Sequence, residues 1–133
     1  MASRFGLRVL LVGCSEEVVR AVRDGGHDAS ARGDGVSAVR DARACTPDVV
    51  ILDLGAVPGD PLSLAREIRT ASLWPKPLFV ALVEGETAEL EAQCKAAGID
   101  LLFVKPVRPA LLAGFLGRLN AVAEEYRSFD PAI

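Results

Sequence analysis

The sequence predicts an α/β fold in which a doubly wound, five-stranded parallel sheet carries helices on both faces. Strand-like and helix-like patterns alternate five times along 133 residues, as expected of repeated strand–helix units. Three of the strand-like runs are apolar almost throughout, which is typical of strands covered on both faces. At this length, and half apolar, residues 1–133 are expected to form one domain, with its core at about 7–119 and its last helix reaching about 127.

The stretch from Pro47 to Gly59 is the centre of the predicted fold. Val49 to Leu52 is an uninterrupted apolar run, mostly β-branched, and predicts a strand buried on both faces. Asp53 is the first polar residue after that run. Ligands in open parallel sheets gather beyond the carboxyl ends of the strands, so Asp53 stands where chemistry is expected. On this stretch alone, an ordinary acid at a strand-to-loop junction is an equally good interpretation.

Four more strands and five helices are expected around this run. The strands are expected at 7–12, 28–32, 78–83 and 101–104, and the helices at about 16–24, 35–45, 60–72, 87–97 and 108–126. In the second helix, Val36, Val39 and Ala42 recur at three-residue steps that continue to Cys45, which predicts a core-facing side. The last helix carries a longer apolar stripe, also expected to be core: Leu111, Leu112, Phe115, Leu116, Leu119, Val122 and Tyr126.

Apolarity also predicts the strand order. The strand at 28–32 alternates small and polar residues and the strand at 101–104 has only four residues, so both suit the edges. Placing the three apolar strands inside gives the order 2-1-3-4-5, that of a flavodoxin-like (βα)5 three-layer sandwich. The competing Rossmann order would move the most apolar strand outward. It would also need a Gly-x-Gly-x-x-Gly turn where the chain has Gly13-Cys14-Ser15-Glu16.

Composition argues against several classes of protein. Fifteen basic residues are scattered among eighteen acids, giving a net charge of −3, so no nucleic-acid-binding surface is expected. No apolar run approaches the ~20 residues that span a bilayer, and no signal-peptide pattern is present, so we expect a cytoplasmic protein without a membrane partner. Cys14, Cys45 and Cys94 lack metal-ligand spacing and are expected to be reduced thiols. His27 follows two glycines and is expected to be a solvated turn residue.

The predicted order brings four strand ends to one place, here called the mouth: Gly13-Cys14, Asp53, Val83-Glu84 and Lys105. The chain resembles the receiver domain of two-component response regulators over about 7–119. The resemblance is carried by these motifs: Pro-Asp-Val-Val-Ile-Leu-Asp at 47–53, a Pro-Gly five residues on, Gly98-Ile99-Asp100, and Lys105-Pro106.

This resemblance implies roles for two residues of the mouth. Asp53 would be the phosphoacceptor and Lys105 the phosphate-binding lysine, with a cis bond between Lys105 and Pro106. Receivers of this kind are not enzymes in their own right; they take a phosphoryl group from a histidine kinase and hold it as an acyl phosphate.

Several positions depart from the family pattern. Where the family has two adjacent acids that hold Mg²⁺, this chain has Gly13 and Cys14, which offer no hard side-chain oxygen. Val83 replaces the hydroxyl residue that bonds the phosphoryl group, and Leu102 replaces the aromatic switch residue. The Pro-Gly after the phosphoacceptor comes one residue late, which puts in question the third metal ligand, the backbone carbonyl of Gly55.

These departures predict the loss of the metal site. A site that works at millimolar Mg²⁺ has only about 4 kcal/mol of binding free energy, which is roughly what one close unit-charge contact is worth at an effective dielectric of ~20. Removing both acids should therefore abolish useful affinity unless a nearby acid (Glu16, Glu17 or Glu84) reaches in, so no cofactor is expected. Without a phosphate or metal, Lys105 is expected to pair directly with Asp53.

The preferred interpretation is a degenerate receiver, or pseudo-receiver, that signals through protein–protein contacts. One alternative is a phosphorelay receiver that is still phosphorylated at Asp53 by a histidine kinase. The other is a thiol redox sensor that uses Cys14, with its pKa lowered by Lys105. Expected partners are a kinase or an output protein, or a second copy bound through the last strand and the last two helices, 88–97 and 108–127. In the last helix, Gly114 and Gly117 would admit a close neighbour, pack on the domain's own sheet or be merely tolerated.

Overall fold

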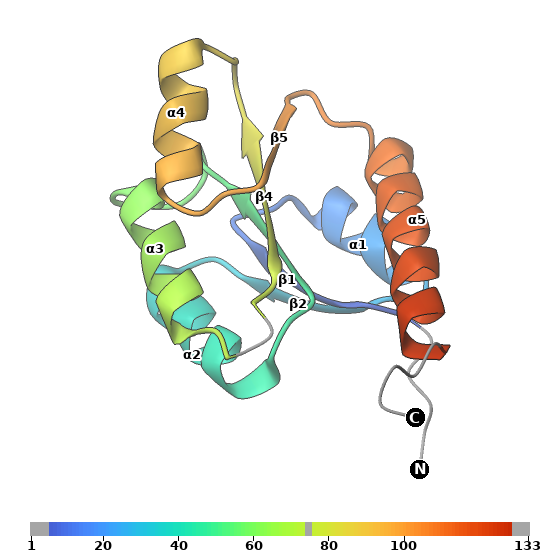
Figure 1. Cartoon of the computed structure of the whole chain (residues 1–133). Helices are drawn as coiled ribbons and strands as arrows, with labels where there is room; N and C mark the ends of the chain where they lie inside the picture. The colour runs from blue at the N-terminus through green and yellow to red at the C-terminus, as the bar shows by residue number, and fades with distance from the viewer. Residues whose placement is uncertain (1–5, 74–75, 129–133) are drawn as a thin grey trace.

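The computed structural model describes residues 6–73 and 76–128, and the elements within them alternate strictly between strand and helix (Figure 1). The strands are β1 (Arg8–Val12), β2 (Asp28–Arg32), β3 (Val49–Asp53), β4 (Leu78–Val83) and β5 (Leu101–Val104). The helices are α1 (Glu16–Asp24), α2 (Gly35–Cys45), α3 (Pro61–Ala71), α4 (Ala88–Ala96) and α5 (Pro109–Ser128). The predicted elements are confirmed, including the bounds of β2, β4 and β5.

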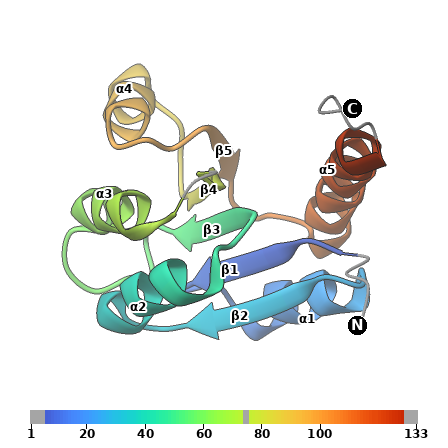
Figure 2. The ribbon, with the colours of Figure 1, turned by 60° about the horizontal axis from the view of Figure 1, so that its bottom comes forward.

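The five strands form one parallel sheet in the order β2-β1-β3-β4-β5, as predicted. In the register, Val12 of β1 lies beside Leu52 of β3, and Asp53 lies beside Leu82 of β4. The carboxyl ends of the central strands therefore reach the same edge of the sheet. Helices α1 and α5 cover one face, and α2, α3 and α4 cover the other (Figure 2). The chain is thus a flavodoxin-like three-layer sandwich.

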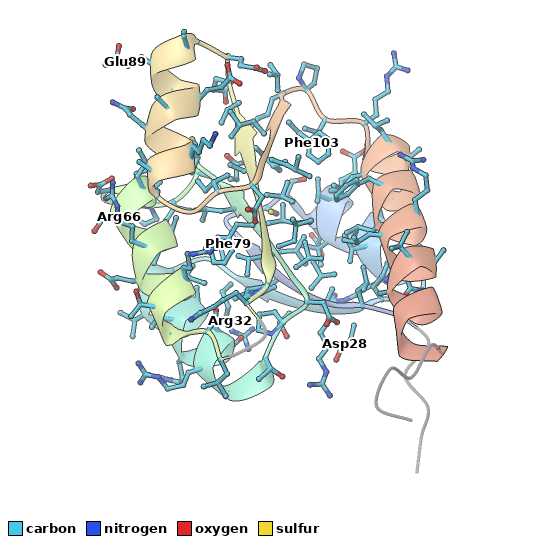
Figure 3. All side chains as sticks on the ribbon, in the orientation of Figure 1. Asp28, Arg32, Arg66, Phe79, Glu89 and Phe103 are labelled. Carbon is cyan, nitrogen blue, oxygen red and sulfur yellow. The ribbon has the colours of Figure 1, made fainter. Side chains whose placement is uncertain are left out.

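Two apolar clusters, one on each face of the sheet, form the core. All five residues of β3 are buried, in agreement with its prediction as a strand covered on both faces. Phe79 of β4 is fully buried on the face covered by α2, α3 and α4. Phe103 of β5 lies on the α5 side (Figure 3), where its ring packs edge to face on Phe115 with the centroids 5.5 Å apart. No helix in the described part of the chain is long and apolar enough to cross a membrane.

The helix faces differ in part from the prediction. Val36 is 72% exposed, whereas Ala38 and Ala42 of the same helix are fully buried. Three-residue steps drift around a helix that has 3.6 residues per turn, and the small alanines allow α2 to approach the sheet closely. In α5, Leu112 and Leu116 are buried but Leu111 and Val122 are exposed, because the apolar stripe is wider than the face that the sheet and α1 cover. The side chain of Tyr126 lies outside the described set.

The prediction of a solvated His27 is wrong. The residue is only 7% exposed, and its Nδ1 accepts a hydrogen bond from the backbone N–H of Leu7 at 3.0 Å. The backbone of Gly6 approaches this turn so closely that a methyl group on Gly6 would clash with the Gly26 carbonyl oxygen and the His27 backbone. Burial lowers the pKa of His27. The folded protein therefore prefers the neutral imidazole with an unprotonated Nδ1.

We expect His27 to make stability depend on pH. A histidine whose folded pKa is lowered contributes fully above its ordinary pKa of about 6.5, and stability is lost as the pH falls below that value. Chemical unfolding followed from neutral to mildly acidic pH should show this loss in the parent and a smaller one in His27→Asn, whose amide oxygen can still accept from Leu7. His27→Leu should cost about 1 kcal/mol at neutral pH, because the Leu7 N–H loses its acceptor. Equal acid sensitivity of the parent and both variants would show that His27 does not control it.

Candidate functional site

The mouth is built around an ion pair between the ends of β3 and β5. The Lys105 Nζ lies 2.7 Å from Asp53 Oδ1, and that oxygen also accepts a hydrogen bond from the Gly55 N–H at 3.1 Å. The pair is largely withdrawn from solvent, with side-chain exposures of 25% for Lys105 and 11% for Asp53. The Lys105 N–H donates to the Val83 carbonyl at 2.7 Å, and the Lys105–Pro106 bond is cis, as predicted. The predicted pairing of Lys105 with Asp53 is confirmed.

A second acid reaches the same lysine. Glu84 directly follows β4, and its Oε1 lies 3.1 Å from Lys105 Nζ. The lysine ammonium has three N–H donors and directs two of them to carboxylates. Its hydrogen bond to Asp53 raises the pKa of Lys105, and the bond to Glu84 adds to this. From the sequence, Glu84 was expected to reach the mouth only as a metal ligand. The adjacent ends of β4 and β5 were the available signal that Glu84 could pair with Lys105.

Gly13 and Cys14 occupy the end of β1, as predicted. Gly13 has a φ of +72°, which L side chains rarely adopt, and its N–H donates to Arg32 O at 2.8 Å. The Cys14 Sγ lies 3.6 Å from the Ile51 carbonyl oxygen. Burial and the negative charge of Asp53 raise the pKa of the Cys14 thiol to about 12, because together they outweigh the opposing effects of Lys105 and the backbone. Lys105 does lower this pKa, as expected, but by less than burial and Asp53 raise it. The expectation of a thiol with a lowered pKa is therefore wrong, and the thiol is neutral at ordinary pH.

The two predicted switch positions are apolar and packed. Val83 is buried at the end of β4, where it has no hydroxyl to offer the mouth. Leu102 is half-buried in β5 and packs against the cluster covered by α2, α3 and α4. Neither side chain can donate a hydrogen bond to a phosphoryl oxygen. The structure thus gives both residues an ordinary packing role.

The residues of the mouth do not fit a magnesium site. Mg²⁺ requires near-octahedral oxygen ligands at close distance. The Asp53 carboxylate is paired with Lys105, and the Glu84 carboxylate bonds the same ammonium. Glu16 and Glu17 are exposed in the first turn of α1, where Ser15 caps the helix. Over residues 6–73 and 76–128, no group of three or more acidic, histidine or cysteine side chains is placed to hold a metal ion.

Comparison with known proteins connects this arrangement to a family of signalling domains. No protein-family model and no curated protein matches the chain. Among solved structures, the receiver domain of the sensor histidine kinase PA1611 from Pseudomonas aeruginosa, which has a magnesium ion in its active-site cleft, is 27% identical. The match covers 87% of this chain and 98% of that one, with a TM-score of 0.72. The chain is a receiver domain.

Two further matches extend this similarity. The chemotaxis protein CheY4 from Vibrio cholerae is 25% identical over 85% of this receiver domain and 98% of its own length, with a TM-score of 0.76. NtrX from Brucella abortus is 21% identical, with a TM-score of 0.69 over 92% of this chain. The receiver domain spans only 29% of the length of NtrX, so what is true of that whole protein does not transfer to it.

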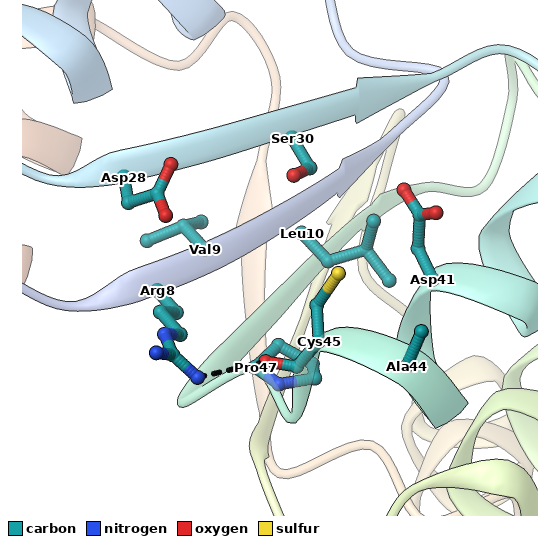
Figure 4. A pocket seen from close by; sticks show the side chains of 9 residues that line it. All are labelled: Arg8, Val9, Leu10, Asp28, Ser30, Asp41, Ala44, Cys45 and Pro47. Carbon is teal, nitrogen blue, oxygen red and sulfur yellow. Dashed lines mark hydrogen bonds between the residues drawn. The ribbon is translucent and has the colours of Figure 1, made fainter.

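The receiver domain also has a hollow remote from the mouth (Figure 4). It measures about 330 Å³ and lies beside the amino-terminal halves of β1 and β2, under the end of α2. Arg8 at its rim donates to the Cys45 carbonyl and to Thr46 Oγ1, both at 3.2 Å. Asp41 at its other end faces Arg32, with Nε 2.8 Å from Oδ2. Arg8 and Asp41 are therefore engaged within the chain, and this hollow is not part of the mouth.

Proposed function

We propose that this receiver domain is a cytoplasmic pseudo-receiver that signals by protein–protein contact and not by Mg²⁺-dependent phosphorylation of Asp53. The observation that carries the proposal is the double engagement of Lys105 by Asp53 and Glu84. In this proposal Asp53 and Lys105 keep the phosphoacceptor and phosphate-binding positions without the metal that would make them work. The domain is a signalling module and not an enzyme.

The charges of the mouth support this proposal. Two carboxylates and one ammonium meet there, and the adjacent Cys14 thiol is neutral, so the mouth carries a net charge of −1. An incoming phosphoryl group adds negative charge to that site. Phosphoryl transfer needs groups that stabilise charge on the phosphoryl oxygens, chiefly a metal ion and hydrogen-bond donors. Val83 supplies no such donor, and Lys105 is already engaged.

The proposed signalling surface consists of α4, β5 and α5. Leu101, Val104 and Leu111 are exposed on it, and a hollow of about 460 Å³ lies between β5 and the start of α5. Exposed acids on α4 include Glu89, which projects outward in Figure 3, whereas residues 105–123 contain basic residues and no acid. The start of α4 is thus acidic and the segment from Lys105 to Arg118 is basic, with an apolar centre between them; Glu124 and Glu125 follow farther along α5. Such a surface is complementary to a second copy that places α4 against α5.

The two interior glycines of α5, Gly114 and Gly117, support self-association through this surface. A methyl group on Gly117 would meet no atom within 4 Å, and one on Gly114 would meet only the Arg118 side chain, at 3.6 Å. The alternative that these glycines pack against the domain's own sheet is therefore wrong. Each costs about 1 kcal/mol relative to alanine in an exposed helix, a cost that close approach of a neighbouring molecule would offset.

We expect self-association through this surface that does not depend on Asp53. Arg118→Glu should weaken it by placing an acid opposite the acidic side of the second copy. Arg20→Glu, the same charge reversal at an exposed position of α1, should leave the self-association intact. Sedimentation at several protein concentrations would measure the association, with and without a phosphodonor. Asp53→Asn should have no effect; a folded Asp53→Asn protein that no longer associates, or a parent that stays monomeric, would contradict the proposal.

The phosphorelay interpretation rests on the two receiver-site residues that this chain retains, Asp53 and Lys105. Asp53 stands at the carboxyl end of β3 with Lys105 beside it, as phosphorylation by a histidine kinase would require. It predicts that association responds to a phosphodonor and to Asp53→Asn, so the same experiment separates it from the pseudo-receiver. The redox interpretation receives no support, because a thiol whose pKa is near 12 forms little thiolate.

A further inference from the structure

Glu84 connects two loops that belong to different strands. It lies in the segment between β4 and α4, and its bond to Lys105 joins that segment to the segment between β5 and α5. The contact forms directly above Gly55: a methyl group on Gly55 would lie 3.7 Å from both Glu84 Oε1 and Lys105 Nζ. The lysine is itself anchored by Asp53 and by its backbone bond to Val83. Glu84 is therefore attached to a fixed point.

Helix α4 is anchored unequally at its two ends. Near its carboxyl end, Cys94 and Ile99 are buried, and Arg69 Nη1 donates to the Gly98 carbonyl at 3.3 Å. Its first residues, Ala88 and Glu89, are exposed, and so are residues 84–87 before them. The first buried contact of the helix comes only from Leu90, which is half-buried. Local opening is easiest where apolar contacts are fewest, so the amino-terminal end of α4 is the end that needs a tie.

We propose that Glu84 is a positioning residue that acts through Lys105 to hold the β4–α4 segment and the start of α4 in place without a phosphoryl group. The inference rests on the proposed function, because it explains how the α4 side of the signalling surface keeps one position. Glu84 provides the anion that ties this segment to the lysine. The tie does not depend on phosphorylation, because the anion belongs to the chain.

The size of the effect follows from solvent exposure. The Glu84 side chain is 79% exposed, and exposed ion pairs stabilise by less than they would in the interior. Breaking the contact should increase local opening by about two- to fivefold, the range typical of exposed pairs. The contact should also weaken with ionic strength, since exposed charges are screened within about 8–10 Å in physiological salt.

Amide hydrogen exchange of residues 84–91 tests the tie. Glu84→Gln should speed exchange in this segment by about two- to fivefold and leave β1 and β3 unchanged. Glu86→Gln is the matched control, because it removes the same charge two residues away from an exposed side chain that makes no ion pair in the described structure. Raising the salt concentration should speed exchange in the parent and much less so in Glu84→Gln.

A second background distinguishes loss of the Glu84–Lys105 contact from any other local effect of Glu84→Gln. In Lys105→Gln, the further change Glu84→Gln should not alter exchange of residues 84–91, because the partner is already absent. Equal exchange in the parent and Glu84→Gln, or an equal effect of Glu86→Gln, would overturn the tie. These outcomes are independent of whether Asp53 accepts phosphate. Failure of the tie and failure of the pseudo-receiver proposal are therefore distinguishable.

Discussion

Replacing Lys105 with methionine is expected to lower the free energy of unfolding by roughly 2 kcal/mol, between the values typical of exposed and fully buried pairs. The substitution keeps most of the side-chain volume and removes the charge. Asp53, whose side chain is 11% exposed, would then lose its ammonium partner and retain, among the described residues, the hydrogen bond from the Gly55 N–H. An uncompensated, nearly buried carboxylate is the source of the loss. Urea unfolding at neutral pH, analysed at constant m-value, measures it.

Two further variants show whether the Asp53–Lys105 pair is responsible for the loss of stability. Lys95→Met removes an exposed lysine of α4 and should change stability by less than about 0.5 kcal/mol. Asp53→Asn should cost less than Lys105→Met, because Lys105 keeps Glu84 and is the more exposed partner. A Lys105→Met protein as stable as the parent would mean that the pair is well solvated.

The second large effect concerns magnesium. Millimolar Mg²⁺, alone or with beryllofluoride, should leave the amide signals of Asp53 and Gly55 unchanged in the parent, because the mouth lacks the oxygen ligands that the ion requires. Cys14→Asp should gain a response to Mg²⁺. It places a carboxylate close enough to Asp53 for their charges to interact, as the effect of Asp53 on the thiol pKa indicates.

Cys14→Ser separates the carboxylate from the loss of the thiol. It has a similar volume and adds no negative charge, so it should respond to Mg²⁺ as weakly as the parent does. A parent protein whose signals around Asp53 shift with millimolar Mg²⁺ would contradict this account of the mouth. A shift in Cys14→Ser equal to that in Cys14→Asp would show that the added carboxylate is not the cause.

The fold was predictable because the residue pattern of each strand agrees with the place of that strand in the sheet. The apolar run of β3 and the small, alternating residues of β2 fix which strands are central and which are edges, and the order follows. The errors arose where a residue's environment depends on distant chain. His27 is buried because Leu7, twenty residues earlier, supplies the donor for its Nδ1. Val36 is exposed because the face that α2 turns to the sheet is set by packing and not by the residue pattern alone.

The mouth was predictable only as far as the strand ends determine it. The pairing of Asp53 with Lys105 follows from two neighbouring strand ends with opposite charges. The adjacent ends of β4 and β5 place Glu84 near Lys105, but spacing does not encode whether this exposed side chain turns back toward the lysine. The pKa of Cys14 depends on the balance between burial, Asp53 and Lys105, and only the three-dimensional arrangement weighs these effects.

Mass spectrometry after incubation with a small acyl phosphate and Mg²⁺ tests the pseudo-receiver proposal most directly. We predict that the intact protein gains no phosphoryl group, because the residues of the mouth do not fit a magnesium site and Lys105 is engaged by Asp53 and Glu84. Asp53→Asn, treated in parallel, identifies any addition that occurs elsewhere on the chain. Addition of one phosphoryl group to the parent, absent from Asp53→Asn, would contradict the proposal and establish Asp53 as a working phosphoacceptor.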